Sequence, residues 1–249
     1  MKFYSLLKSR NYYFIPDEIQ EKIFRSKILF AGCGLGSNIA ILAARTGFRN
    51  FSLFDGDIVE TSNLNRQCFE VGQVGENKAK ALDDNIKKIN KESEVLASEK
   101  FITSVNDFTT ADNIDFVINT VDFSEIFFEI TEFFVSKRSV VFLPLNIGFA
   151  SMVYIFNQEN LEYFLSFKDK IKSDFDMFNF LLSTTKNSEV VKKFNGEQLF
   201  KKINEMGFQP QLGIAANLNA SNVVIQMLNI LSNKKIRIFP EVNELTLNL

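Results

Sequence analysis

The chain has 249 residues, a formal net charge of −2 and a hydrophobic fraction of 46%, so it can bury a substantial core as one α/β domain. It contains no histidine and only two cysteines, which excludes imidazole chemistry, a disulfide scaffold and a Cys-x-x-Cys zinc site. The charge gives no basic footprint for nucleic acid. Catalysis must therefore use carboxylates, cations, backbone amides or a thiol.

Two stretches bear on localisation. Residues 1–14 lack the continuous apolar core and small-residue cleavage site of a signal peptide. The longest apolar run, Val140 to Phe156, is interrupted by Pro144, Asn146 and Gly148. This pattern favours two strands joined by a turn over a membrane span. We therefore expect a cytoplasmic protein without a membrane partner.

A short amphipathic helix is predicted to lead into the first strand. Pro16 precedes a pattern that places Ile19 and Ile23 on one helix face. The polar and aromatic segment before it contains Arg10. Residues 1–26 are thus expected to form an N-terminal helical segment.

A glycine turn follows the first predicted strand. Residues 28–31 form a short apolar run, which is typical of a buried parallel strand. Gly32, Gly34 and Gly36 then allow a sharp turn and a close approach to a ligand. A helix over 37–45 would point its free N–H groups at a phosphate. By itself this turn is equally compatible with a tight packing turn and a nucleotide site.

An acid follows the second predicted strand, and two cations follow the acid. Asp55 comes directly after the strand over 51–54, where the ribose-binding acid of a nucleotide site belongs. Arg66 lies among polar side chains in the segment 62–67, and Lys78 begins another helix. Two cations near one glycine turn imply more phosphate charge than a dehydrogenase's pyrophosphate requires.

Helices and strands continue to alternate, which predicts a doubly wound, mostly parallel sheet of Rossmann type. Asp122 closely follows a buried strand, at the edge where ligands bind in such sheets. The predicted elements are a helix over 76–90, strands over 94–101 and 114–120, a helix over 125–138 capped by Ser124, and strands over 140–145 and 151–156.

The last third of the chain changes character. Residues 158–207 are rich in lysine, phenylalanine and asparagine, with helical patterns and no clear strand. We interpret them as a helical insertion after the nucleotide-binding core of 27–157, covering one end of the sheet rather than gripping substrate. Residues 208–249 are expected to supply an apolar helix over 213–231 and strands over 236–239 and 245–249.

Five motifs in order resemble the ubiquitin-activating-enzyme-like adenylyltransferases, which include the ThiF, MoeB and HesA proteins. They are Gly-Cys-Gly-Leu-Gly-Ser at 32–37, Asp-Gly-Asp at 55–57, Ser-Asn-Leu-Asn-Arg-Gln at 62–67, Gly-x-x-Lys at 75–78 and Thr-Val-Asp at 120–122. A weaker echo is Pro-Gln-Leu-Gly at 210–213. The resemblance implies a Rossmann-like fold and ATP-dependent adenylation of the C-terminal carboxylate of a small ubiquitin-like or sulfur-carrier protein or peptide.

The resemblance also implies roles for individual residues. Asp55 would bind the ribose, and Asn63, Arg66 and Lys78 would contact phosphates. The whole expected nucleotide-binding set is Gly32, Gly34, Gly36, Ser37, Asp55, Asp57, Asn63, Arg66 and Lys78. Catalysis would rest on Arg66, Lys78, Asp122 and Arg10, with Asp122 as the Mg²⁺ ligand and Arg10 reaching the triphosphate of a partner subunit. Family members are usually homodimers, so we expect one here.

The sequence departs from the family pattern in three ways. One glycine of the usual Gly-x-Gly-Gly-x-Gly loop is missing or replaced. The structural zinc of many relatives is not expected, because the cysteines are too few. Cys33 and Cys68 are interpreted as packing residues, and neither occupies the position of the thioester-forming cysteine. We therefore expect no covalent thioester on this chain.

Other readings stay open from the sequence. Arg66 and Lys78 could be surface cations paired with Asp57, Glu60 or Glu76, and Asp122 could cap a helix. The chain could be an inactive family member that binds a peptide or dimerises with an active paralogue. Activation of a carboxylate on tRNA and nicotinamide-dependent dehydrogenation are disfavoured, the first by the neutral charge and the second by the lack of a histidine acid.

Overall fold

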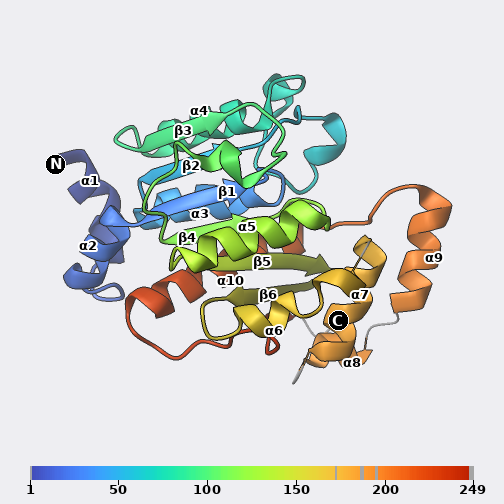
Figure 1. Ribbon diagram of the computed structural model, residues 1–249. Coiled ribbons are helices and arrows are strands. Elements are labelled where there is room, and N and C mark those ends of the chain that lie inside the picture. Colours follow the sequence, from blue (N-terminus) through green and yellow to red (C-terminus); the bar gives the residue numbers. More distant parts are fainter. Residues whose placement is uncertain (1, 172, 186–187, 194–195, 247–249) are drawn as a thin grey trace.

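The computed structural model describes residues 2–171, 173–185, 188–193 and 196–246. Its described strands form a seven-stranded sheet in the order β3-β2-β1-β4-β5-β6-β7 (Figure 1). The first five of these pair in parallel, and β6 and β7 are antiparallel to their neighbours. The strands are β1 (Lys27–Ala31), β2 (Asn50–Phe54), β3 (Glu94–Ser98), β4 (Phe116–Asn119), β5 (Val140–Ile147), β6 (Ala150–Phe156) and β7 (Asn243–Thr246).

Helices cover both faces of the sheet, because alternate strand residues face opposite cores. In β1, Ile28 and Phe30 join the core under one helix layer, and Leu29 and Ala31 join the other. The first layer is α2 (Asp17–Arg25), α3 (Gly36–Thr46), α4 (Lys78–Ile89) and α10 (Gly213–Leu231); the second includes α5 (Glu125–Ser136), α6 (Leu161–Leu165) and α7 (Asp174–Thr184). Figure 1 shows α5 in front of the sheet, with α3 and α10 behind it. The predicted doubly wound α/β fold is confirmed.

From β1 the chain adds β2 and β3 on one side of the sheet and then β4 and β5 on the other. The strand order therefore reverses between β1 and β4. In doubly wound sheets the crevice outside the carboxyl ends of such strands is where ligands bind. The glycine turn after β1 and the residues that follow β4 meet there. This edge of the sheet therefore holds the candidate site.

The N-terminal segment lies at the end of α3 that is farther from the glycine turn. It consists of α1 (Lys2–Leu7), the 3₁₀ helix η1 (Lys8–Asn11) and α2, and Ile19 and Ile23 of α2 are buried as predicted. Asn11 Nδ2 donates to the carbonyl oxygen of Thr46 over 3.0 Å. Because Thr46 ends α3, this segment is anchored at the far end of the helix from the glycine turn.

The described residues between 158 and 206 contain helices and no strand, as expected. They form α6, α7, α8 (Glu189–Lys193), α9 (Gly196–Met206) and the 3₁₀ helix η5 (Lys168–Lys170). Phe164 of α6 packs on Phe156 of β6, with ring centroids 4.3 Å apart. Figure 1 shows α9 set apart from the sheet at one side. The inner helices of this region cover the sheet.

Two sequence expectations about individual elements are wrong. Residues 236–239 are not a strand: Phe239 inserts its ring among Phe156 and Phe164, and Pro240 offers no N–H for a ladder. Ser124 stands at the N-cap of α5 but makes no capping hydrogen bond; its hydroxyl donates to the carbonyl oxygen of Asp122 over 3.3 Å instead.

Several predicted boundaries also shift. The third strand ends at Ser98 rather than at residue 101. The strand predicted over 114–120 is β4, which spans only Phe116–Asn119. The strand expected over 245–249 begins earlier, as β7, and residues 247–249 lie outside the described residues. The apolar run over 140–156 is confirmed as two strands joined by a turn at Gly148, which has a φ of +57°.

The long helix α10 is apolar and long enough to cross a membrane by composition. Its buried side, which includes Ala215, Ala220 and Val223, packs in the core shared with α3. That packing explains the composition without a membrane, because a core helix needs the same apolar residues.

Candidate active site

The turn after β1 needs glycine at its first position. Gly32 has a φ of +95°, and a Cβ there would lie 2.6 Å from Thr120 Oγ1 and 3.0 Å from the Thr120 carbonyl oxygen. Thr120 Oγ1 donates to the Gly32 carbonyl oxygen over 3.0 Å. A Cβ on Gly36 would lie 2.9 Å from the Phe30 ring. The turn is therefore packed tightly between the ends of β1 and β4.

The amino end of α3 is tied to the polar loop around Arg66. The Ser37 hydroxyl donates to the Gly34 carbonyl oxygen over 2.7 Å and accepts from the Cys68 amide over 3.0 Å. Asn38 Nδ2 donates to the carbonyl oxygen of Arg66 over 2.6 Å. The Ser37 side chain is fully buried, so within this structure it fastens the loop. The backbone N–H groups of the helix end remain the groups suited to a phosphate.

Asp55 is bound to the glycine turn itself. Its Oδ2 accepts from the Cys33 amide over 2.7 Å, and its Oδ1 accepts from the Asp57 amide over 2.8 Å. Burial raises the pKa of Asp55, although these two amides and the Lys78 charge favour the carboxylate and partly offset that effect. The pairing places the acid beside the turn, as the sequence predicted.

Lys78 is buried and paired with an acid. It has 9% of its surface exposed, and its Nζ lies 2.9 Å from Asp57 Oδ2. Its backbone N–H donates to the Asp57 carbonyl oxygen over 2.9 Å. Asn77 caps α4 by accepting from the amides of Ala79 and Lys80, and its Nδ2 donates to the Asp55 carbonyl oxygen over 2.8 Å. The expected pairing with Asp57 is present, but Lys78 is not a surface cation.

Arg66 is held only by neutral acceptors among the described residues. Its Nε donates to Gln211 Oε1 over 2.6 Å, and its Nη1 donates to the Ser62 carbonyl oxygen over 2.8 Å and to Asn65 Oδ1 over 2.9 Å. Partial burial lowers the pKa of Arg66, and the charge of Glu60 acts against that effect. Because arginine stays protonated in proteins, the guanidinium is a charged group that neutral oxygens position, without an ion pair among the described residues.

Asn63 organises the loop before Arg66. It is buried, its Oδ1 accepts from the Glu60 amide over 3.0 Å, and Glu60 caps the same 3₁₀ helix, η2 (Thr61–Asn63), in return. Its contact with phosphate stays a prediction. The structure shows the residue acting on the loop backbone.

Four residues of the site were not assigned a role from the sequence: Asn38, Gln67, Thr120 and Gln211. Gln67 Nε2 would lie 3.2 Å from a Cβ on Gly34, so this side chain lines the turn. Gly213, which follows Gln211, would place a Cβ 2.5 Å from the Asn65 carbonyl oxygen. The Pro-Gln-Leu-Gly echo at 210–213 was the only sequence signal for the contact between α10 and the loop.

Asp122 lies just beyond Thr120, at the end of β4. It is exposed, and its carboxylate makes no hydrogen bond or ion pair with the residues the structure describes. Those residues contain no group of three or more acids or cysteines that could hold a metal ion. A single exposed carboxylate is nevertheless sufficient for the Mg²⁺ sites in which waters and phosphate oxygens are the other ligands.

Arg10 is the predicted residue that the chain does not bring to this edge. It is exposed and lies on η1, which is anchored at the end of α3. That helix has 11 residues, so at 1.5 Å per residue it separates the two ends by roughly 16 Å. Within one chain, Arg10 and the glycine turn are therefore at opposite ends.

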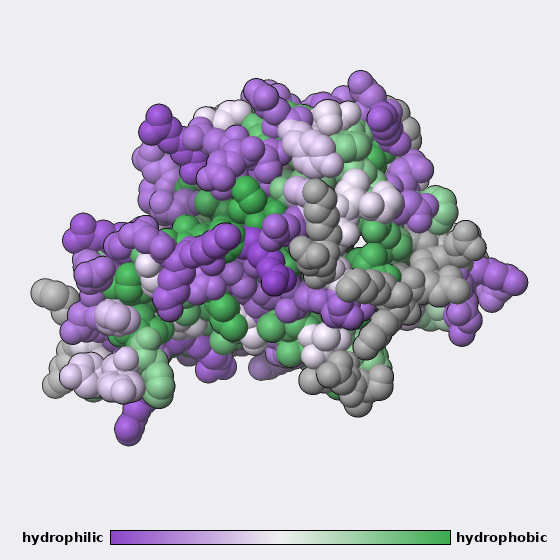
Figure 2. Space-filling view, turned by 90° about the horizontal axis from the view of Figure 1, so that it is seen from below, coloured by the Kyte–Doolittle hydropathy of each residue, from purple (hydrophilic) through white to green (hydrophobic). Residues whose placement is uncertain are grey.

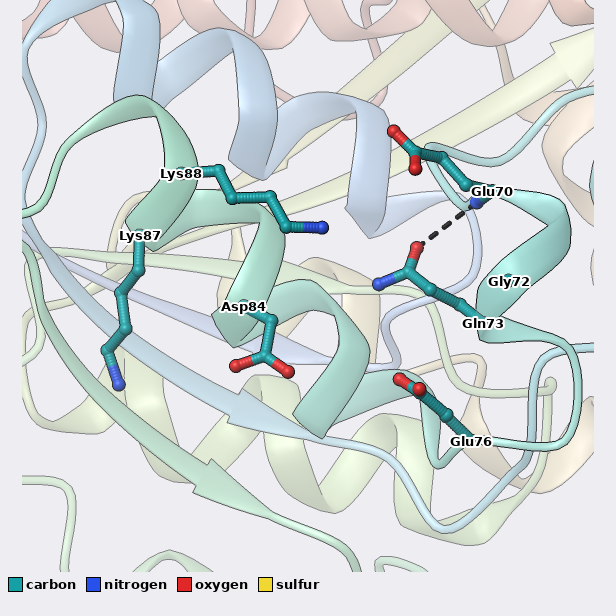
Figure 3. A pocket seen from close by; sticks show the side chains of 7 residues that line it. All are labelled: Glu70, Gly72, Gln73, Glu76, Asp84, Lys87 and Lys88. Carbon is teal, nitrogen blue, oxygen red and sulfur yellow. Dashed lines mark hydrogen bonds between the residues drawn. The ribbon is translucent and has the colours of Figure 1, made fainter.

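A surface pocket lies elsewhere, over α4 and the 3₁₀ helix η3 (Val71–Gln73) (Figure 3). It has a volume of about 580 Å³. Charges of both signs line it, and none of the predicted site residues does. Its lining residues are Glu70, Gly72, Gln73, Glu76, Asp84, Lys87 and Lys88.

The chain matches the model of the ThiF family over residues 8–247. Among curated proteins it is 27% identical over 235 residues to a probable molybdopterin-synthase adenylyltransferase of Gracilaria tenuistipitata var. liui, covering 92% of this chain and 63% of that protein. It is 40% identical over 75 residues to the NEDD8-activating enzyme E1 catalytic subunit of Schizosaccharomyces pombe, covering 29% of this chain and 17% of that protein. The chain therefore spans less than two thirds of these relatives.

Solved structures share the fold. PaaA aligns with a TM-score of 0.66 and 21% identity, over 98% of this chain and 76% of PaaA. E. coli MccB, solved with AMPCPP and MccA, aligns with a TM-score of 0.67 and 16% identity, over 98% of this chain and 71% of MccB. Both comparisons extend over almost the whole chain, so the sheet and the described helices together follow one known architecture.

Proposed function

The chain belongs to the ThiF family, and from that premise we propose that it is an adenylyltransferase that uses ATP to activate the C-terminal carboxylate of a small ubiquitin-like or sulfur-carrier protein or peptide. The observation that carries this proposal is that Asp55 and Lys78 lie beside the glycine turn and that the loop of Arg66 is fastened to the start of α3, with the Arg66 guanidinium held by neutral acceptors. Relatives named as molybdopterin-synthase adenylyltransferases support the reaction class, and MccB solved with AMPCPP and MccA supports a peptide substrate.

The reaction needs a held triphosphate and charge stabilisation, but no general base. The ionised carboxylate attacks the α-phosphorus, the bond from that phosphorus to the bridging oxygen breaks, and pyrophosphate leaves with the electron pair. Charge grows on the departing oxygens as this happens. Fixed cations beside those oxygens stabilise the transition state more than the ground state. The absence of histidine is consistent with such chemistry.

Each group has a role that its contacts suit. The turn and the end of α3 offer backbone N–H groups to phosphate, Asp55 accepts from the ribose hydroxyls, and Asn63 contacts phosphate once the loop is loaded. Arg66, held by Gln211 and Ser62, faces phosphate as a preformed cation. Lys78 joins it by exchanging its Asp57 contact for phosphate oxygens.

Magnesium would be held by Asp122 together with phosphate oxygens. The ion supplies charge neutralisation at the triphosphate. The Asp122 carboxylate is exposed and has no protein partner among the described residues, so it is free to take this role. It is the metal ligand of the proposal.

The proposed reaction ends with the adenylate rather than a thioester on this chain. Cys33 is fully buried, and burial raises its pKa well above the usual value. Burial also raises the pKa of Cys68, whose Sγ lies 3.1 Å from Asn38 Oδ1. Thiols in such settings are poor nucleophiles. The acyl adenylate would then pass to a sulfur donor, an amine or another protein's thiol.

A homodimer in the cytoplasm completes the proposal. Arg10 lies far from the glycine turn of its own chain, so it would serve the triphosphate of a partner subunit. The neighbouring Tyr12, Tyr13 and Phe14 are 77%, 85% and 83% exposed, and hydrophobic surface also lies among hydrophilic side chains in the view from below (Figure 2). Because these three aromatic residues are consecutive, they form a contiguous exposed segment of the kind that a partner covers.

The test is exchange of labelled pyrophosphate into ATP. Wild-type protein with candidate small proteins or C-terminal peptides, beginning with products of neighbouring reading frames that end in Gly-Gly, should catalyse exchange only when the partner is present. Arg66→Ala should remove exchange and keep the fold. An inactive family member would instead bind nucleotide without catalysing exchange for any partner, and its nucleotide affinity would be the same in Arg66→Ala as in the wild type. That alternative is not favoured by the comparisons or by the Arg66 contacts.

A further inference from the structure

A buried chain of hydrogen bonds runs from α10 to the carboxyl end of β5. Asn222 Nδ2 donates to the carbonyl oxygen of Asn243 over 2.9 Å and to Ser151 Oγ over 3.2 Å. Ser151 Oγ donates to Asn219 Oδ1 over 2.9 Å, and Asn219 Nδ2 donates to Asn146 Oδ1 over 2.5 Å. Ser151, Asn219 and Asn222 are at most 2% exposed.

This chain of hydrogen bonds fixes the orientation of every side-chain amide in it. A carbonyl oxygen only accepts, so Asn222 must turn its Nδ2 toward Asn243 and Ser151. The Ser151 hydroxyl then donates onward to Asn219. Reversing Asn219 would leave that buried hydroxyl with donors on two sides and no acceptor among the described residues. Asn219 therefore donates from its Nδ2 to Asn146, and Asn146 must accept that hydrogen bond with its Oδ1.

The consequence is a directed donor at the end of the chain. Asn146 Nδ2 is buried and has no hydrogen-bond partner among the described residues, although buried N–H groups are rarely left without one. Asn146 stands next to last in β5, at the edge of the sheet that holds the site. Phe142, four residues earlier, packs in the core beneath α3 and α10, which places Asn146 on the same face.

The position favours the acyl substrate over the nucleotide. Asp55 and Lys78 lie at the ends of β2 and α4, whereas β4 separates β5 from β1. Neighbouring strands are about 4.8 Å apart, so Asn146 stands roughly 10 Å to the side of the glycine turn, beyond the strand that leads to Asp122. An attacking carboxylate must reach the α-phosphorus from the side opposite the departing pyrophosphate. The end of β5 lies across β4 from the glycine turn, on the side away from β2 and Asp55.

We infer that Asn146 is a substrate-positioning residue whose Nδ2 binds an acyl oxygen of the peptide tail, its carboxylate or its last carbonyl, and that Asn219, Ser151 and Asn222 hold it in the donating orientation. This inference rests on the proposed function and names the part of the site that takes the peptide.

The test compares two adenylate analogues in titration calorimetry. One is 5′-O-sulfamoyladenosine, and the other is 5′-O-(N-glycylglycylsulfamoyl)adenosine, which adds two acyl oxygens of a Gly-Gly tail. AMPCPP reports the nucleotide half of the site. Wild-type protein should bind the acylated analogue about tenfold or more tightly than the unacylated one, as a hydrogen bond from a fixed donor permits.

Two variants remove the donor in different ways. Asn146→Ala deletes it, and Asn219→Asp replaces the group facing Asn146 with an acceptor, so Asn146 turns its Nδ2 inward and its Oδ1 toward the substrate. Both should lose the acyl increment and keep AMPCPP affinity. Asn106→Asp makes the same substitution as the second variant at an exposed residue of the 3₁₀ helix η4 (Val105–Phe108), outside the hydrogen-bond chain, and should keep the increment. Thermal unfolding of each variant reports the fold.

The outcomes separate the inference from the function beneath it. An acyl increment that survives in Asn146→Ala would show that the amide binds only water and would overturn the inference. The same holds if AMPCPP affinity falls equally, or if wild type binds AMPCPP and gains nothing from the acyl group. Failure of wild type to bind AMPCPP or either analogue would overturn the proposed function, and this inference with it.

Discussion

The two cations of the site are presented in opposite ways. Lys78 lies on the β2–α4 side, buried and 2.9 Å from the Asp57 carboxylate. Arg66 lies on the loop side, fixed by the neutral oxygens of Gln211, Ser62 and Asn65. A fixed cation without an ion pair can act on phosphate without rearrangement, whereas a paired one must first leave its acid. The loop side is therefore preorganised, whereas Lys78 on the β2–α4 side would have to leave Asp57 before it could bind a phosphate.

The largest expected effect comes from removing the preorganised cation. Arg66→Ala should lower kcat for partner-dependent pyrophosphate exchange about 10²- to 10³-fold, the usual cost of losing one transition-state donor. Arg25→Ala is the control, because Arg25 is exposed and pairs with Glu21 on the surface. Equal activity of the two variants would remove Arg66 from the mechanism.

The glycine turn is shared by both sides, so its disruption should affect them together. Gly32→Ala places a Cβ against Thr120 in a backbone conformation with a φ of +95°. It should lower the free energy of unfolding by about 1–3 kcal/mol and weaken AMPCPP binding. Gly72→Ala, where a Cβ meets nothing within 4 Å, should leave both unchanged. Chemical denaturation and calorimetry measure the two quantities.

The neutral support of Arg66 can be removed without touching the cation. Gln211→Ala leaves the guanidinium without its Nε acceptor and should lower kcat about tenfold, the equivalent of about 1.4 kcal/mol, with a smaller change in the KM for ATP. Gln158→Ala is the matched control, because Gln158 is an exposed glutamine in the turn after β6. An unchanged kcat in Gln211→Ala would show that Ser62 and Asn65 suffice to hold Arg66.

The acid that pairs with Lys78 offers the opposite test. If Asp57 serves chiefly as the counterion of Lys78, Asp57→Asn frees the lysine and should raise AMPCPP affinity about two- to fivefold, within the range of one partly exposed ion pair. Calorimetry at low and high salt measures it. Weaker binding would instead place Asp57 among the groups that contact the nucleotide, as the family motif implies.

The smallest expected effect is a pH dependence from Asp55. Burial raises its pKa, so AMPCPP affinity should begin to fall, as the pH is lowered, at a higher pH than an ordinary aspartate would give. Asp55→Asn should flatten this profile. The sign for folding is opposite: since the folded-state pKa is raised, this group's contribution to stability is full below its unfolded pKa and is lost as pH rises through the folded value.

The parts of the site that adjoin in sequence were predictable. The spacing of Gly32, Asp55, Arg66 and Lys78 along strand, turn and helix indicated one nucleotide site, and the structure confirms that Asp55 touches the turn and that Lys78 starts α4. The prediction of a strand over 236–239 is wrong because the apolar side chain of Phe239 does not belong to a strand. Its ring packs in an aromatic cluster with Phe156 and Phe164. Periodicity does not distinguish these two uses of an apolar residue.

The sequence by itself determined the fold class and the edge of the sheet that holds the candidate site, because burial, glycine and charge follow local patterns along the sequence. Only the tertiary structure decided that Gln211 accepts a hydrogen bond from Arg66, 145 residues away in the sequence. It also decided that Arg10 lies at the end of α3 farther from the glycine turn, and that the hydrogen bonds from α10 leave Asn146 Nδ2 of β5 without a partner among the described residues. Those facts depend on which distant segments pack together, and hydrogen-bond direction is fixed only once every partner is in place.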